Sequence, residues 1–472
     1  MKHHFNALLL VLLSGCSVVT PQPGFNDVKG IVAGRIGEEV VWRAGTEEKP
    51  SSEESEIEAS IDVILADELT LPEALKIALL NNRGMQAVYQ ELAIAEADLV
   101  RAGRISNPVL DGELRFPSGG GSAVIELALV QDFLDLLFLR SRVRIAESDF
   151  EAVKLRVALQ VLRLAGDVRR TYYELLAAEQ RVEMRQQVRT ASKGAYELAR
   201  SLRAAGNITA LSLLNEKQLY ERSKLDLRRA ELEAAQKREE LNQLLGVWGD
   251  RTLWASSSRL PDLPEARAYD EQLERLAVER SLELEARRRA IEGAAARLKI
   301  SLPAALFSGS ELGASAEREK GWGVGPSLSL PIPIFDLGGA SAARAKAALR
   351  REIEMYTQHA VLLRSRAREL QSAERVLWEQ ADYYKRVMLP LSSEIVQQTQ
   401  LQYNAMQLSP FELLSAKQRQ IETGERYIDA LRDYWLVRSQ IDQLAAGGEV
   451  APSSGGSPAA EGKWETLRES VH

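Results

Sequence analysis

The sequence predicts a mainly α-helical fold with a small β part, built from two copies of one large unit. Two segments about 200 residues apart, 205–218 and 405–418, align without a gap. Each separates two long stretches of helical periodicity, and each half also holds two short alternating segments. A repeat of this size indicates a duplicated unit and not a solenoid of small repeats. The matched pairs are Ile208/Leu408, Thr209/Ser409, Leu213/Leu413, Leu214/Leu414, Lys217/Lys417 and Gln218/Gln418.

Residues 1–16 have the features of a secretory signal peptide. Lys2 gives a positive start, and the apolar run Ala7–Leu13 is too short to cross a bilayer as a helix. The end of this run resembles the bacterial lipoprotein box, whose cysteine, here Cys16, becomes the lipidated (palmitate-carrying) first residue of the mature chain. Ser17 stands where an inner-membrane retention signal has Asp, so the resemblance implies the outer membrane. The alternative is an ordinary secretory signal with a chance cysteine.

The composition favours long, solvated helices over a compact enzyme core. The chain has 472 residues, of which 27% are charged and 6% are aromatic, and its net charge is −7. This balance argues against nucleic acid as a partner. Since Cys16 is the only cysteine, no disulfide within the chain and no Cys-based metal site are expected. No later segment has about 20 consecutive apolar residues, so no transmembrane helix is expected.

Changes in composition divide the chain. Residues 17–68 are rich in Gly, Ser, Pro and Glu and predict a flexible tether. The two structural repeats then occupy residues 69–250 and 268–446, joined by a linker over 251–267 that contains two prolines. Residues 447–472 predict a disordered tail.

Each repeat is expected to begin with a helix, over Leu71–Gly103 and Tyr269–Ile300. Thr70 and Glu73 form a capping box, with Pro72 in the first turn, where its missing N–H is tolerated. Two strands follow in each repeat. The four predicted strands are about residues 107–116, 123–133, 303–315 and 323–332.

The strands have the length of tilted membrane strands. Such strands need about 9–11 residues of alternating character. In the segment 123–133, Glu126 and Asp132 lie on one face and Leu127 and Leu129 on the other. A soluble hairpin would show the same pattern, so both interpretations stay open. If the strands lie in lipid, the sheet must close, because open edges leave backbone groups unpaired in hydrocarbon. Several chains must then share it.

The longest helices are the strongest local signal. From Asp135 to about Ala205 the pattern predicts a rod of about 100 Å, which must pack against other rods. A shorter helix returns over Leu211–Leu245. The second repeat is expected to do the same over 340–406 and 411–444, with a bend or interruption at Pro390.

An ordered set of motifs resembles the outer-membrane factor family of bacterial efflux and secretion systems, the TolC type, over about residues 69–446. The motifs are Leu71-Pro72-Glu73-Ala74-Leu75 through Asn81-Asn82, Asn107-Pro108, Leu241-Asn242-Gln243-Leu244-Leu245-Gly246, Pro331-Ile332-Pro333-Ile334-Phe335-Asp336 and the Tyr403…Ser409…Leu413-Leu414 break.

The resemblance implies a homotrimer in a Gram-negative bacterium, held in outer-membrane lipid and extending into the periplasm. Three chains would form a twelve-stranded β-barrel continued by a periplasmic α-helical barrel. The trimer would be the passive channel of a tripartite system, working with an inner-membrane transporter and a periplasmic adaptor (membrane fusion) protein. The alternative is a lipid-anchored periplasmic coiled-coil scaffold with a soluble hairpin. The exported substrate, whether a drug, a metal ion or a protein, cannot be read from the sequence.

By the same resemblance, the two helical breaks, at about 203–212 and 403–412, are the tips that contact the adaptor. Gly206 suits a tight turn, while Met406 at the equivalent position leaves the second turn undefined. Glu412 and Ser415 occupy the places where the family narrows its entrance with aspartate rings; an N-terminal helix carboxylate is the other explanation of Glu412. The remaining tip residues are Asn207, Ile208, Thr209, Leu213, Gln407, Leu408, Ser409 and Leu413, of which Thr209 and Ser409 are expected to cap the returning helices.

No catalytic constellation accompanies these features. His359 stands alone on a helical pattern, and no HExxH, CxxC, nucleophile-elbow or dinucleotide motif is present. The sequence therefore predicts no enzyme activity, no cofactor and no intrinsic metal site.

Overall fold

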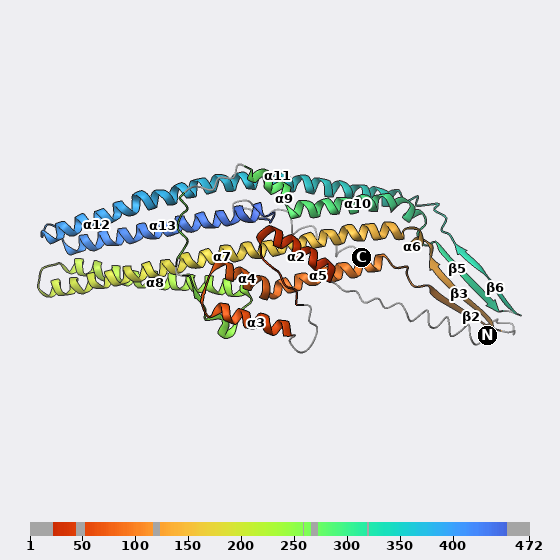
Figure 1. Ribbon diagram of the computed structural model, residues 1–472, viewed down its shortest axis with the longest axis horizontal. Helices are drawn as coiled ribbons and strands as arrows, with labels where there is room; N and C mark the ends of the chain where they lie inside the picture. Colours follow the sequence, from red (N-terminus) through yellow and green to blue (C-terminus); the bar gives the residue numbers. More distant parts are fainter. Residues whose placement is uncertain are drawn as a thin grey trace. The chain divides into compact units, whose positions relative to one another are not determined.

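The computed structural model describes residues 22–43, 52–116, 123–257, 259–265, 272–318 and 321–450, which are mostly helical (Figure 1). The chain divides into two units. The first, the sheet unit, contains the residues up to Gly34, Gly84–Gln160 and Leu282–Val361. The second, the hairpin unit, contains Arg35–Arg83, Val161–Ser281 and the residues from Leu362 onward.

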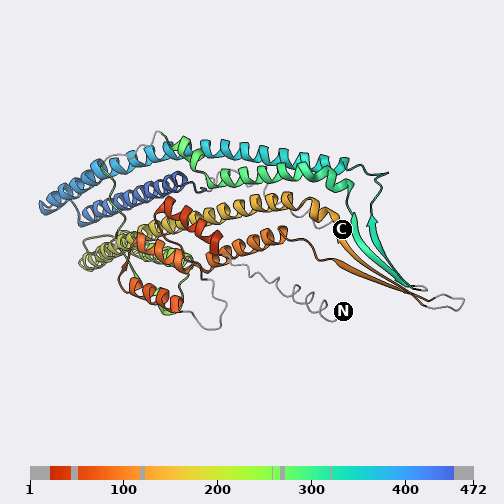
Figure 2. The same ribbon diagram turned by 45° about the vertical axis from the view of Figure 1, so that its right-hand side comes forward.

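The sheet unit joins the strands to the helices that lead into and out of them (Figure 2). Two helices that begin here, α7 and α11, continue into the hairpin unit. The elements in chain order are α2 (Gln22–Ile36), α5 (Arg83–Ala102), β2 (Val109–Arg115), β3 (Val124–Asp132), α6 (Phe133–Leu137), α7 (Leu139–Ala204), α10 (Leu282–Leu306), β5 (Glu311–Arg318), β6 (Trp322–Ser329) and α11 (Gly339–Tyr383).

The hairpin unit holds the two returning helices and a short two-stranded parallel ladder, β1–β4, which the sequence did not predict. Its elements are α3 (Ser52–Leu65), β1 (Glu68–Leu69), α4 (Leu71–Asn81), α8 (Ala210–Leu245), η1 (Gly249–Thr252), β4 (Ala255–Ser256), α9 (Leu273–Arg280), η2 (Tyr384–Met388), α12 (Leu389–Asn404) and α13 (Pro410–Ala445).

The duplicated plan is confirmed. In each half a helix leads into a strand hairpin, a long helix follows, and a second helix returns after a short turn. The four larger strands form one antiparallel sheet in the order β2-β3-β5-β6, so each half contributes one hairpin and β3 pairs with β5. The fold is mainly α-helical with a small β part, as the sequence predicts.

Hydrogen bonds from Asn81 join the start of the first repeat to its end. The Nδ2 group of Asn81 donates to the carbonyls of Leu245 at 3.0 Å and Gly246 at 2.7 Å. Gly246 ends α8 with a φ of 69°, and a Cβ there would lie 2.8 Å from the Asn81 carbonyl oxygen. Only glycine combines this left-handed conformation with so close an approach.

The predicted capping box at the start of α4 is confirmed. The Thr70 N–H donates to Glu73 Oε2 at 2.8 Å, and the Thr70 hydroxyl donates to the same oxygen at 2.6 Å. These two bonds stabilise the ionised carboxylate and lower the pKa of Glu73.

The first helix of each repeat is not continuous, contrary to the sequence prediction. Asn82, with ψ of 113°, separates α4 from α5, and Ser281, with ψ of 116°, separates α9 from α10. Both residue types readily leave the helical conformation because their short polar side chains compete for backbone hydrogen bonds. The two breaks stand at equivalent places in the repeats.

The predicted flexible tether is wrong where the structure describes it. Residues 22–36 and 52–65 form helices α2 and α3. In the sheet unit, the Phe25 ring packs edge-on against Tyr89 at 5.1 Å, and Lys154 Nζ lies 2.6 Å from Asp27 Oδ2. Val28 and Val32 are fully buried, so an apolar stripe at helical spacing prevails over the Gly- and Pro-containing composition.

The third strand also begins later than the predicted 303–315. Helix α10 runs to Leu306 with Pro303 inside it, and β5 begins at Glu311. Residues 304–306 have high helix propensity, and the Pro303 carbonyl still accepts from the Phe307 N–H at 3.1 Å. Strands β2 and β3 lie within two residues of their predicted limits, while β6 ends at Ser329, three residues before its predicted end.

The interruption predicted at Pro390 is confirmed. The five residues of η2, Tyr384–Met388, form a π-helical turn between α11 and α12, with Pro390 next to them. A proline removes one helical N–H, and a π-turn is one way in which a helix absorbs the resulting strain.

Candidate functional site

Strand register sorts the side chains of the sheet into two chemically different faces. Glu126 of β3 lies opposite Glu113 of β2 and Glu317 of β5, while Leu127 lies opposite Gly112 and Ala316. Because successive side chains point to opposite sides, these rows belong to different faces. The apolar face carries Leu110, Leu114, Ile125, Leu127, Leu129, Leu312, Ala314, Ala316, Trp322, Val324, Pro326 and Leu328, with Gln131 and Arg318 at its two ends.

The apolar face is exposed in the single chain. Leu110 is 70% exposed and Val324 is 77% exposed. A contiguous exposed apolar surface of this kind marks contact with a partner or a membrane.

The opposite face is acidic and rich in small residues. It carries Asp111, Glu113, Glu126, Asp132, Glu311 and Glu317, with Arg115 as its basic residue and Gly or Ser on β6. Arg115 pairs with Glu113 at 2.7 Å and with Glu126 at 3.1 Å. Val109, Val124, Ala128 and Val130 share this face, so acidic side chains alternate along it with apolar ones.

Two outer strands, β2 and β6, form the edges of this sheet, and neither has a second neighbour among the described residues. An edge strand presents unpaired backbone N–H and C=O groups, which can pair with another chain. The geometry thus combines one apolar face, one acidic face and two open edges.

The two breaks between long helices have the same hydrogen-bonded geometry. In the first, the Asn207 N–H donates to the Leu202 carbonyl at 2.8 Å; in the second, the Gln407 N–H donates to the Gln402 carbonyl at 2.9 Å. The residue before each donor is left-handed, with φ of 78° at Gly206 and 60° at Met406. Both are Schellman turns, in which a left-handed residue lets the last carbonyls of a helix find donors. The second turn is thereby defined although it lacks glycine.

The helices that return from the breaks begin with caps. The Thr209 hydroxyl accepts from the Ser212 N–H at 3.1 Å. In the second turn, the Ser409 N–H donates to Glu412 Oε2 at 2.8 Å, so the Glu412 carboxylate binds the start of its own helix. Ser415 Oγ accepts from Arg419 at 2.9 Å. The caps predicted at both turns are present, and the second of them uses Glu412.

A charged cluster inside the hairpin unit joins α7 to both returning helices. Arg181 lies 2.6 Å from Glu233 of α8 and 2.6 Å from Asp429 of α13. One turn later, Arg185 lies 2.7 Å from Glu425 of α13. We call these five residues the arginine clamp.

Within the clamp, Glu425 is a buried carboxylate. Its residue is 8% exposed, and burial raises its pKa although Arg185 and Arg181 act in the opposite direction.

The sequence analysis, which predicts long, solvated helices from the charge content, did not identify this cluster. Arg181 and Arg185 continue, at helical spacing, the buried stripe that holds Ala178 and Ser192. That spacing is the signal that would have indicated buried arginines.

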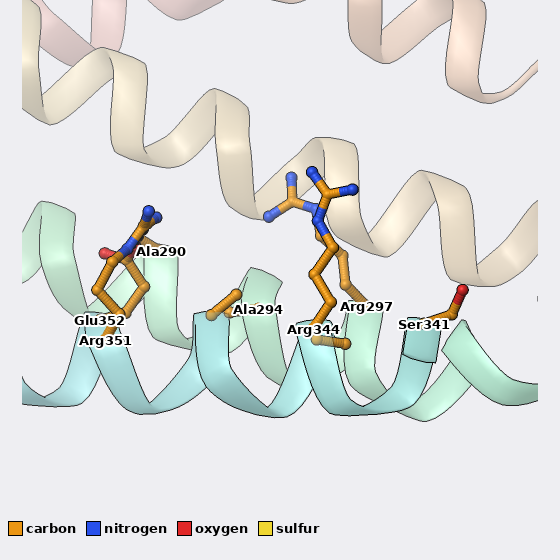
Figure 3. Close-up of a pocket in the computed structure, with 9 residues that line it drawn as sticks. Ala290, Ala294, Arg297, Ser341, Arg344, Arg351 and Glu352 are labelled. Carbon is orange, nitrogen blue, oxygen red and sulfur yellow. Dashed lines mark hydrogen bonds and ion pairs between the residues drawn. The ribbon is translucent and has the colours of Figure 1, made fainter. Parts of the chain in front are cut away.

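A hollow of about 370 Å³ lies between α10 and α11 of the sheet unit (Figure 3). Its floor is alanine, and Figure 3 shows Arg297 and Arg344 extending to the same side of it. Arg297 pairs with Asp149, and Arg351 pairs with Glu352 at 2.6 Å. Since two of its three arginines are already neutralised, the hollow is a weak recognition site.

Several sequence predictions lie outside the described residues, including the signal peptide, Cys16 and the tail beyond residue 450. Among the helices in the described ranges, none is both long and apolar enough to cross a membrane. Within those same ranges, no group of three or more His, Cys, Asp or Glu side chains is arranged to hold a metal ion.

Residues 74–247 match the model of the outer membrane efflux protein family. A comparison with curated proteins found no match.

Solved structures share the fold over most of the chain. The CmeC outer membrane channel of Campylobacter jejuni is 16% identical, covers 87% of this chain and 92% of its own, and has a TM-score of 0.68. The MtrE outer membrane channel of Neisseria gonorrhoeae, in its open state, is 19% identical over 80% of this chain and 89% of its own, with a TM-score of 0.65. VceC, an outer membrane protein of Vibrio cholerae, is 16% identical over 80% of this chain and 96% of its own, with a TM-score of 0.61.

Residues 74–247 are therefore similar to the outer membrane efflux protein family, and the chain shares its fold with outer membrane channels. The family match over the first repeat and the fold shared across both repeats confirm the resemblance to the outer-membrane factor family of the TolC type.

Proposed function

We propose that this chain is one subunit of a homotrimeric outer-membrane channel in a tripartite export system. It would conduct substrates passively from an inner-membrane pump and a periplasmic adaptor to the exterior. The observation that carries the proposal is the sheet, which has an apolar face, an acidic face and two unpaired edges.

If the sheet lies in lipid, it must close into a barrel with other copies. A four-stranded sheet cannot sit alone in hydrocarbon, because its edge groups would lack hydrogen-bond partners at a cost of several kcal/mol each. Pairing β6 of one copy with β2 of the next removes every edge, with the leucines outside against lipid and the acidic row inside against water. Three copies give twelve strands, a barrel wide enough for a water-filled lumen.

The two Schellman turns would be the periplasmic tips that meet the adaptor. Their sequences and hydrogen bonds repeat closely, so one adaptor surface could bind both. The proposed contacts are Gly206, Asn207, Ile208, Thr209, Leu213, Gln407, Leu408, Ser409 and Leu413.

Glu412 and Ser415 are proposed to narrow the entrance of the channel. Three Glu412 carboxylates near one axis would repel one another and favour cations. In the single chain Glu412 already caps α13, so the two roles share one side chain. The proposal also includes lipidation of Cys16. The protein would lie in the outer membrane and extend into the periplasm.

Cross-linking between edge strands tests the trimer directly. In a Cys16→Ser background, Asp111→Cys on β2 and Gly325→Cys on β6 occupy one row of the acidic face at opposite edges. A long bis-maleimide should convert the detergent-solubilised protein into covalent trimers.

The matched control places the same two groups on the paired central strands. Ala128→Cys and Ser315→Cys face each other across β3 and β5 and should cross-link only within one chain. If the edge pair also gave only monomers, closure between copies would be wrong, and a lipid-anchored scaffold with a soluble hairpin would be the better description.

A further inference from the structure

The paired strands are short for the membrane they are proposed to cross. They contain seven to nine residues, and β6 has eight. At about 3.3 Å per residue and a tilt of about 40°, eight residues span about 20 Å of membrane, whereas the apolar band of such barrels is about 25 Å tall. Part of the lipid-facing surface must come from outside the paired strands.

The segment that follows β6 supplies exposed apolar side chains. Ile332 is 80% exposed, Ile334 is 71% exposed and Phe335 is fully exposed. Leu330, Ile332 and Ile334 continue in sequence the even-numbered spacing of Val324 and Leu328, and they lie just beyond the end of β6. We call Leu330–Phe335 the collar.

The backbone of the collar is also suited to an apolar environment. Pro331 and Pro333 have no N–H, and the Ile334 N–H donates to the Ile332 carbonyl at 2.8 Å. Only Leu330 and Ile332 add further donors between residues 330 and 334. Fewer free donors reduce the cost of placing this chain in lipid.

The other strands also have exposed apolar residues at the helical end of the sheet, where Asp132, Glu311 and Ser329 lie in register and Val109 lies opposite Val130. Ile105 precedes β2, Leu136 and Leu137 follow β3, and Phe307 precedes β5; all are exposed. Asp336 then accepts from the Gly338 N–H at 2.8 Å just before α11 begins, which marks the return to a polar setting.

We propose that the collar, Leu330–Phe335, inserts into the inner leaflet of the outer membrane and extends the lipid-facing band below β6. The proposal rests on the proposed channel function. Its occupant is lipid, because a second copy would pair with the edge of β6 and leave the face free. Phe335 would lie at the headgroup boundary, where aromatic residues form girdles.

Site-specific quenching tests the collar. Single cysteines replace Ile332 in the collar, Val324 on the apolar face of β6, and Ser327 on the acidic face, each in the Cys16→Ser background. Each is labelled with a nitrobenzoxadiazole dye, and the protein is reconstituted into phosphatidylcholine vesicles with or without brominated acyl chains. Iodide serves as the aqueous quencher, and Ile334→Cys replaces Ile332→Cys if that variant fails to assemble.

The expected result is several-fold stronger quenching by brominated lipid at positions 324 and 332 than at 327, with iodide showing the reverse order. If position 324 responds to lipid while 332 responds to iodide or to neither quencher, the collar proposal is wrong and the channel stands. If position 324 also fails to respond to lipid, the proposed function itself fails.

Discussion

Met406, in the second turn between long helices, has a left-handed backbone conformation. Met406 has φ of 60° and is 94% exposed, whereas Gly206 holds the equivalent place in the first turn. A residue with a Cβ loses about 1–2 kcal/mol in this conformation, which glycine does not. The sequence could locate both turns but could not show that Met406 accepts the strain, because the hydrogen bonds that offset it are visible only in the structure.

Met406→Gly should therefore stabilise the turn. We expect the free energy of unfolding to rise by about 0.5–1 kcal/mol, since strain is removed and little packing is lost at an exposed site. The measurement is the thermal midpoint of the detergent-solubilised protein. The mirror variant, Gly206→Ala, should lower the midpoint; equal midpoints for both variants and the wild type would mean that the left-handed conformation carries no strain.

Glu425 should give stability a defined dependence on pH. Burial raises its pKa in the folded state, so folding favours the protonated form. Its contribution to stability is greatest below about pH 4.3, the ordinary value, and declines as pH rises through the folded-state pKa. As the pH rises over that window, the wild type should lose stability relative to the Glu425→Gln variant.

Thermal midpoints of both proteins between pH 4 and 8 test this. Glu394→Gln removes a charge from an exposed position on α12 and serves as the control. A constant difference between wild type and Glu425→Gln at every pH would contradict the assigned burial effect.

At the scale of the helix and strand, periodicity predicted the type of element better than its limits. The long helix α7 has 66 residues, about 100 Å, as its uninterrupted pattern indicates. The breaks at Asn82 and Ser281 were missed because the apolar spacing continues across them. At the first break, Asn82 donates to the carbonyl of the distant Leu244 at 2.9 Å, a contact that only the structure shows.

Helix α2 is the opposite case: the structure contains a helix that local composition did not predict. Its glycines disfavour a helix in isolation, but burial of Val28 and Val32 against the sheet unit outweighs that preference. Local composition could not reveal the surface that covers it.

The arginine clamp should hold the two helical hairpins together. Arg181→Met leaves Glu233 and Asp429 without their shared cation, and we expect a loss of about 1–3 kcal/mol of unfolding free energy. The control is Arg228→Met, which breaks the exposed pair with Glu231 within α8 and should cost less than about 0.5 kcal/mol. Equal effects in denaturant titrations would show that the clamp contributes no more than a surface pair.

At the scale of the whole molecule, the sequence predicted the duplicated plan and the presence of the four larger strands. It could not separate a lipid-facing sheet from a soluble hairpin, because the alternation of one strand, such as 123–133, fits both. The register favours the lipid-facing interpretation, because it aligns the leucines of β3 with apolar or small residues on its neighbours and Glu126 with acidic ones. Such rows form only when four distant segments pair.

The proposed entrance gives a prediction for conduction. Glu412→Ala should raise single-channel conductance in planar bilayers, because it removes three like charges from a narrow ring. Glu412→Gln should do the same while keeping an acceptor for the Ser409 N–H, and Thr209→Ala, which removes only a helix cap, should leave conductance unchanged. Unchanged conductance in both Glu412 variants would remove this residue from the gate.

The central claim is that identical copies join their open sheets around a water-filled passage. The most direct measurement is the conductance of the purified Cys16→Ser protein in a planar lipid bilayer, since this variant lacks any lipid anchor. We expect stepwise, ohmic increases in current from trimers that need detergent to stay in solution. A monomer that is soluble in plain buffer and adds no conductance would contradict the account.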